Sequence, residues 1–220
     1  MKSLSISFTL GKQSKAHSVN IEHNNRDFLA NNIDSKKLNE NIKYITEDPE
    51  LAYEKLFSDA LKEYNEKQKQ PCRKISSYYK HIQKSNREEA FYEAVIQYGD
   101  KDTAAHGTAT GDEAKKMLDE YIKGFQERNP NLYVFNAIMH NDEATPHIHL
   151  DFIPFYTQGR QKGLSKGVSL KAALIEQGFV PTNAMKNQVV AWEESERNAM
   201  EKILNAHGFE REERMQNTFT

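Results

Sequence analysis

The sequence is short of the residues that build disulfide-rich and membrane-spanning proteins. A single cysteine among 220 residues excludes an intramolecular disulfide framework and is compatible with a reducing cytoplasm. No apolar run approaches the length of a membrane span, and residues 3–10 alternate between polar and apolar types instead of forming the apolar region of a signal peptide. We therefore expect a cytoplasmic protein with no integral membrane segment.

A positive net charge, which is typical of proteins that bind nucleic acids, is also missing. The formal charge is -2, a mild argument against a DNA partner. The charges are unevenly distributed, however, because residues 67–87 contain seven Lys or Arg residues and no acid, and residues 152–175 are also free of acids. Such stretches suit phosphate contacts and base stacking on tyrosines, with a solvated surface as the alternative. The predicted DNA contacts are Arg73, Lys74, Tyr78, Tyr79, Lys80, Arg160, Lys162 and Lys166.

The order of predicted elements indicates the fold class. Alternation over residues 3–10 predicts a half-buried strand, and apolar residues at helical spacing after Asp48-Pro49 predict an amphipathic helix. Further strands are expected over residues 91–98, 132–139 and 148–155, and further helices over residues 112–129, 166–177 and 182–207. This order predicts an α+β fold, an antiparallel four- to five-stranded sheet with helices packed on one face. We expect one catalytic domain over residues 1–208 and a charged tail over residues 209–220.

Three of the eight histidines fall within the ten residues from His140 to His149. The apolar runs on either side predict two antiparallel strands joined by a short loop, with Pro146 at the start of the second strand. Side chains alternate along a strand, so His147 and His149 share one face, and hairpin pairing places His140 roughly opposite His147. Three imidazoles that converge on one patch of a sheet predict a metal site with open positions for water or substrate.

The number of cysteines indicates which kind of metal site this is. Closed structural zinc sites favour cysteine, and Cys72 is the only cysteine, so an open and reactive site is favoured. Glu143 and Asp142 can add a carboxylate, either as a weak ligand or by orienting a histidine. Three histidines alone leave zinc, manganese, nickel and copper open as the bound metal, and a chance cluster is the alternative to any metal.

Two motifs carry a family resemblance. The pattern His140-x-Asp-Glu-x-Thr-Pro-His-x-His149 resembles the histidine motif of the plasmid mobilisation relaxases of the Mob/Pre (MobV) type, members of the HUH endonuclease superfamily. Near the N-terminus, His23-Asn24-Asn25-Arg26 resembles the His-Asn-x-Arg segment of the same family. The order and the wide separation of the two motifs also fit, and the resemblance extends from about residue 3 to about residue 208.

The resemblance implies a bacterial enzyme that nicks one DNA strand at a plasmid transfer origin. The metal would be Mn2+ or Mg2+, with Zn2+ as a further candidate, bound by His140, His147 and His149. The resemblance makes His23 the nucleophile, which keeps the cut strand covalently attached, whereas most HUH enzymes use a tyrosine and Tyr44 is the nearest one. Arg26 would hold the scissile phosphate or shield the leaving oxygen, and Glu143 would bind the metal or orient a ligand.

The resemblance also implies partners, and other functions remain as alternatives. Single-stranded or hairpin DNA at the transfer origin is the expected substrate, and related relaxases suggest a homodimer formed through a C-terminal region beyond Thr220. The first alternative is a rolling-circle replication initiator with a tyrosine nucleophile. The others are a metal-dependent hydrolase of a small phosphoester and a DNA-binding module in which the metal only braces the hairpin.

Overall fold

The computed structural model describes residues 2–12, 21–27, 33, 35–85, 87–158, 163–180 and 187–212. Its centre is an antiparallel sheet with the strand order β2-β4-β6-β5-β3, and a short strand, β7, pairs with β6. The strands are β2 (Ile6–Lys12), β3 (Ile42–Thr46), β4 (Tyr92–Tyr98), β5 (Leu132–His140), β6 (His147–Tyr156) and β7 (Gly167–Val168). The predicted α+β class and antiparallel sheet are confirmed. The sheet has six strands, because β3 and β7 are strands that the sequence patterns did not predict.

One face of the sheet is apolar and is covered by helices, as predicted. Ile148, Leu150 and Phe152 on β6 belong to a core that also includes Trp192, whose ring packs edge-on against Phe8 at 5.4 Å and Phe152 at 5.8 Å. The covering helices are α4 (Ala109–Lys123), α5 (Phe125–Arg128), α6 (Leu170–Glu176) and α7 (Gln188–Ala206). Helix α4 begins three residues before the predicted start, because the Thr108 side chain accepts the Gly111 amide as its N-cap.

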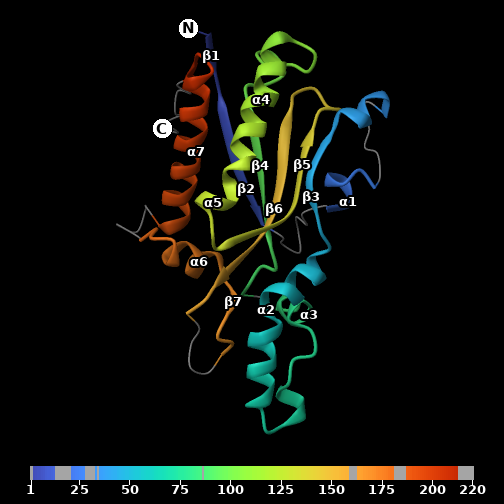
Figure 1. Ribbon diagram of the computed structural model, residues 1–220, viewed down its shortest axis with the longest axis vertical. Helices are drawn as coiled ribbons and strands as arrows, with labels where there is room; N and C mark the ends of the chain where they lie inside the picture. Colours follow the sequence, from blue (N-terminus) through green and yellow to red (C-terminus); the bar gives the residue numbers. More distant parts are fainter. Residues whose placement is uncertain are drawn as a thin grey trace, which may run out of the picture.

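The opposite face carries the histidines at one end and a second core at the other. Helix α2 (Pro49–Glu66) has the predicted Asp48 N-cap, and it packs with α3 (Tyr78–Gln83) against Phe135 and Ile153 of the sheet. A short 3-10 helix, η2 (Pro71–Arg73), connects the two helices. In Figure 1, α2 and α3 project beyond the lower end of the sheet, whereas the turn between β5 and β6 lies at the upper end.

Two short strands from opposite ends of the described chain pair with each other. β1 (Lys2–Leu4) pairs in parallel with β8 (Phe209–Arg211), and the Glu212 amide donates to the carbonyl of Leu4. The predicted tail starts at residue 209, so its boundary cuts through paired structure and must be corrected, while residues 213–220 lie outside the described residues. No helix in the described part of the chain has both the length and the apolar character needed to cross a membrane.

Candidate active site and metal centre

The β5–β6 hairpin brings the three predicted histidines together. His140 pairs directly with His147 across the two strands, which confirms the register expected from the sequence. His149 lies two residues further along β6 on the same face, and its ring centroid is 4.6 Å from that of His140 and 5.0 Å from that of His147. One ring nitrogen of each histidine lies within 4.8 Å of the others, which is the convergence that a single metal ion requires.

Hydrogen bonds orient each imidazole so that its second nitrogen faces this cluster. His140 Nε2 donates to the carbonyl of Asn24 at 2.8 Å, and His147 Nδ1 donates to the carbonyl of Thr145 at 2.8 Å. His149 Nδ1 donates to Glu93 Oε1 at 2.6 Å. A carbonyl or carboxylate on one nitrogen fixes the lone pair on the other, as in metal-binding histidines generally. His140 Nδ1 is fully buried and has no hydrogen-bond partner, so the residues present fit a metal ion.

The surroundings of His140 and His147 favour their neutral rings, which are the form that binds a metal. Burial, followed by the neighbouring His149, lowers the pKa of His140 to about 3. Burial also lowers the pKa of His147. Burial alone would raise the pKa of Glu93, but the hydrogen bonds from His149 and Asn24 and the charge interactions with His149 and His23 together lower it, so Glu93 is the ionised partner of His149.

Arg26 joins the histidine hairpin to the second motif. Its Nε and Nη2 atoms donate to the two oxygens of Asp142 at 2.9 and 2.6 Å, and Nη2 also donates to Glu143 Oε1 at 2.7 Å. Its Nη1 atom lies 3.3 Å from both the carbonyl and Nε2 of His23. A guanidinium has five N–H donors, and all five are engaged within the protein. The Arg26 side chain is only 7% exposed, and each of its three nitrogens has a partner within the protein.

His23 lies beside the cluster, on the short helix α1 (Ile21–Asn24). Its ring centroid is 6.2 Å from that of His140 and 6.1 Å from that of His149. Because arginine has no acceptor, His23 Nε2 must accept from Arg26, which places the ring proton on Nδ1. Burial, followed by the charge of Arg26, lowers the pKa of His23 below 6.5, so the ring is neutral at neutral pH.

Tyr44, the competing nucleophile, lies on the wrong side of the sheet. Its hydroxyl donates at 3.0 Å to Asp119 of α4, on the face that the helices cover. Burial and the Asp119 carboxylate raise the pKa of this phenol, which keeps it protonated and poorly nucleophilic. The sheet itself separates Tyr44 from the histidines.

Four residues of the site were missed by sequence reasoning. Asn24 donates to Glu93 at 2.8 Å and to Asp151 at 3.3 Å, and Asn136 also donates to Asp151 at 2.8 Å. Burial and the neighbouring Glu93 raise the pKa of Asp151 to about 7. The acids at 93 and 151 were detectable, because each is a charged residue on a half-apolar strand and shares a face with the histidines in a period-two pattern.

The predicted DNA contacts lie away from this cluster, on the lobe formed by α2 and α3. Arg73, Lys74 and Lys80 are exposed there, and Tyr79 is half-buried. Tyr78 is 8% exposed and packs edge-on against Phe57, so its assignment as a stacking platform is corrected to a core residue. Lys80 lies 3.1 Å from Glu50.

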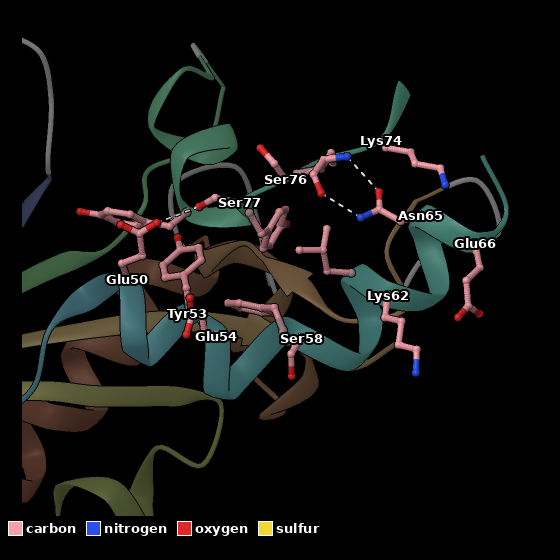
Figure 2. Close-up of a pocket in the computed structure, with 15 residues that line it drawn as sticks. Glu50, Tyr53, Glu54, Ser58, Lys62, Asn65, Glu66, Lys74, Ser76 and Ser77 are labelled. Atoms are coloured by element: carbon pink, nitrogen blue, oxygen red, sulfur yellow. Dashed lines mark hydrogen bonds between the residues drawn. The ribbon is translucent and has the colours of Figure 1, made fainter. Parts of the chain in front are cut away.

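A groove of about 430 Å³ runs between α2 and the segment before α3. Figure 2 shows Lys62 on α2 and Lys74 on the facing segment, and Asn65 bonds both backbone groups of Ile75. Lys166 stands over the ring of Phe155 at 4.3 Å, close to this lobe. Arg160 and Lys162, the remaining predicted contacts, lie outside the described residues.

The geometry can be compared with known proteins. Residues 30–177, more than half of the chain, match the Mob_Pre family, which is described as plasmid recombination enzyme. The chain belongs to the plasmid recombination enzyme family. The family match includes the three clustered histidines and Glu93, whereas it begins after His23 and Arg26.

Solved structures agree with this assignment at the level of the fold. Crystal structures of the MobM relaxase domain, Mn-bound and in complex with plasmid pMV158 oriT DNA, superpose on nearly the whole chain. The structure at pH 5.5 gives a TM-score of 0.52 at 19% sequence identity and covers 98% of this chain and 93% of that chain. The structure at pH 4.6 gives a TM-score of 0.54 at 18% identity, with 98% and 94% covered. No curated protein matches the chain.

Proposed function

We propose that this member of the plasmid recombination enzyme family is a metal-dependent DNA relaxase that nicks one strand at a plasmid transfer origin and holds the cut strand on His23. The observation that carries the proposal is the placement of a neutral histidine within 6.2 Å of a three-histidine metal centre, ring centroid to ring centroid, with one arginine bound to both elements. The MobM relaxase domain, which shares the fold, is bound to oriT DNA and manganese in its crystal structures.

In the proposed reaction, the lone pair on His23 Nε2 is released from its hydrogen bond with Arg26 and attacks the phosphorus of the scissile phosphodiester. The N–P bond forms as the bond to the 3′ oxygen breaks, and the products are a phosphoramidate at the 5′ end and a free 3′ hydroxyl. The ring loses its Nδ1 proton and the leaving oxygen gains one, so the protons balance through solvent. The retained phosphoramidate bond allows the strand to be rejoined, which hydrolysis by water would not.

The metal would be Mn2+ or Mg2+, with Zn2+ also compatible with three imidazoles. When bound by His140, His147 and His149, it supplies a Lewis acid for a phosphate oxygen. Glu93 and the carbonyl oxygens of Asn24 and Thr145 hold the three rings in place.

Arg26 takes a positioning role in this proposal. Its guanidinium fixes the tautomer of His23 and ties Asp142 and Glu143 to the same point, and a phosphate would have to displace one of these bonds. Glu143 is therefore a partner of Arg26, and its carboxylate Oε1 lies 3.8 Å from His140 Nδ1.

The substrate is proposed to be single-stranded or hairpin DNA in the bacterial cytoplasm. The exposed residues Arg73, Lys74 and Lys80, together with Lys166 and the half-buried Tyr79, offer cations and an aromatic ring for a DNA segment beyond the cut site. Helices α2 and α3 and the turn between β5 and β6, the strands that carry the histidines, lie at opposite ends of the sheet (Figure 1), which suits a substrate that extends over many nucleotides.

The test is covalent adduct formation with Mn2+ and labelled single-stranded oligonucleotides from a cognate transfer origin. We expect a protein–DNA band on a denaturing gel for wild type and for Tyr44→Phe, and none for His23→Ala or after chelation. An adduct that survives His23→Ala and disappears in Tyr44→Phe would contradict the assignment of the nucleophile. Cleavage without any adduct would instead indicate a hydrolase, and binding without cleavage a DNA-binding module.

Adduct formation should also follow the protonation of His23. Only the neutral ring attacks, and its pKa lies below 6.5, so the rate should stay constant from pH 8 to about 6.5 and fall as the pH drops through the lowered pKa. Single-turnover rates measured across this range test the sign. A rate that already falls between pH 8 and 7 would show that His23 is not the titrating nucleophile.

A further inference from the structure

Both polar atoms of the Asn41 side-chain amide form hydrogen bonds with the loop between β5 and β6. It follows the 3-10 helix η1 (Ser35–Glu40) and precedes β3. Its Oδ1 accepts the backbone amide of Asn141 at 2.7 Å, and its Nδ2 donates to Asp142 Oδ2 at 2.6 Å. In the described part of the chain, no other side chain bonds both the backbone and a side chain of residues 141–142.

The preceding residue strengthens this clamp. The carbonyl of Glu40 accepts the side-chain amide of Asn141 at 2.7 Å, and the Glu40 carboxylate lies 2.7 Å from His106 Nε2. The backbone amide of His106 in turn donates to the carbonyl of Ala144 at 2.9 Å. Four hydrogen bonds therefore connect residues 40, 41 and 106 to the loop from residue 141 to residue 144.

Asp142 connects Asn41 to Arg26, the residue that bonds His23. Its side chain is fully buried, and besides the Asn41 bond it accepts two bonds from Arg26. Burial alone would raise the pKa of this carboxyl, but the hydrogen bonds from Arg26 and Asn41 outweigh burial and lower it. A buried carboxylate with fixed donors has one orientation, and that orientation sets where the Arg26 guanidinium meets His23.

We propose that Asn41 is a positioning residue that aligns His23 with the metal centre through Asp142 and Arg26. The inference rests on the proposed nicking function. Asn41 bonds neither His23 nor any of the three clustered histidines, and Asn24, Thr145 and Glu93 hold the three histidine rings separately. Its loss therefore acts on the nucleophile and leaves metal binding unchanged.

The experiment compares Asn41→Ala with Asn39→Ala in the Mn2+-loaded protein. Asn39 is the matched control, since it is an exposed asparagine two residues earlier in the same segment. We expect the single-turnover rate of adduct formation to fall about 10- to 100-fold in Asn41→Ala, the usual size for loss of an outer-shell partner, and to stay at the wild-type value in Asn39→Ala. Oligonucleotide and Mn2+ dissociation constants should not change, because the lost interaction serves only the chemical step.

Asn41→Asp keeps the side-chain size and the acceptor for the Asn141 amide. It places a second carboxylate against Asp142 in place of the amide donor, so the adduct rate should fall at least as far as in Asn41→Ala while the protein stays folded. This variant keeps the proposal testable if Asn41→Ala does not fold. Equal adduct rates in Asn41→Asp, Asn39→Ala and wild type would overturn the proposal.

Hydrogen exchange gives a readout that does not need activity. Loss of the Asn41 clamp should speed exchange of backbone amides in residues 21–27, the remote segment that carries His23 and Arg26, as well as in residues 141–144. If wild type forms no adduct, the nicking proposal fails, and exchange alone decides the positioning role. Faster exchange confined to residues 141–144, with residues 21–27 unchanged, would show a local structural role and overturn the coupling.

Discussion

The two faces of the central sheet differ in what holds them together, although the same strands build both. On β6, Ile148, Leu150 and Phe152 point into the helix-covered core, and His147, His149 and Asp151 point to the other side. The first face is stabilised by non-directional apolar burial, whereas the histidine end of the second face depends on hydrogen bonds with defined partners. One alternating strand therefore supplies both the stability of the fold and the geometry of the site.

The largest effect should come from removing a ligand on the polar face. His149→Ala is expected to weaken Mn2+ binding by more than the roughly 10- to 100-fold that loss of an outer-shell partner costs, and to abolish adduct formation. Isothermal titration with Mn2+ measures this directly. His81→Ala is the control, because His81 is an exposed histidine on α3. Unchanged Mn2+ affinity in His149→Ala would place the metal elsewhere.

The apolar face should respond in stability instead. Leu150 is fully buried beside His149, so Leu150→Ala is expected to lower the free energy of unfolding by about 2–5 kcal/mol. Leu51→Ala is the matched control, since Leu51 is 53% exposed and should change stability little. Denaturant unfolding provides the measurement, and equal losses in the two variants would contradict the separation of the faces.

A smaller effect on Mn2+ affinity is expected from changing Glu93, which reaches the metal site through its hydrogen bond with His149. Glu93→Gln keeps the hydrogen bond to His149 but removes the negative charge, so Mn2+ affinity should fall by about 10-fold while the unfolding midpoint stays close to wild type. Glu54→Gln changes an exposed glutamate and serves as the control. If Glu93→Gln instead binds Mn2+ like wild type, the charge on this partner is irrelevant to the metal.

The smallest effect concerns the helix layer over the apolar face. His207, at the end of α7, bonds Glu113 at 2.7 Å and Glu120 at 3.1 Å on α4, and the Glu113 bond raises its pKa above 6.5. A raised pKa means that the stabilisation is fully present below pH 6.5 and is lost as the pH rises through the raised value. The difference should be below about 1 kcal/mol, because solvent reaches both side chains, which are 20% and 29% exposed, and weakens the interaction. Unfolding of wild type and His207→Gln at pH 6 and pH 9 measures it, and an equal pH dependence in both would assign it to another group.

Local patterns were sufficient for the parts of the site that lie within one hairpin. The spacing of His140, His147 and His149 predicted their shared face and their pairing, since strand alternation and short-loop pairing are local rules. The Asp48 N-cap and the apolar stripe of α2 were predicted for the same reason.

Contacts between distant segments could not be predicted in this way. Arg26 reaches Asp142 over 116 residues and Asn41 reaches it over 101, and no periodicity links such positions. Polar residues in a loop suggest solvent or DNA contacts when they are considered alone, so the sequence around Asn41 does not indicate its role. Only the fold shows that its amide is directed at the histidine loop.

Because β1 pairs with β8, this part of the fold cannot form until β8 has been synthesised. Residues 21–151, which contain the whole candidate site, are synthesised before α7 and β8 leave the ribosome. The apolar face of β2, β4 and β6 then lacks Trp192, Met200 and Leu204 until the last part of synthesis. During that interval the nascent chain exposes a broad apolar sheet surface, and this is the surface that chaperones have to protect from aggregation.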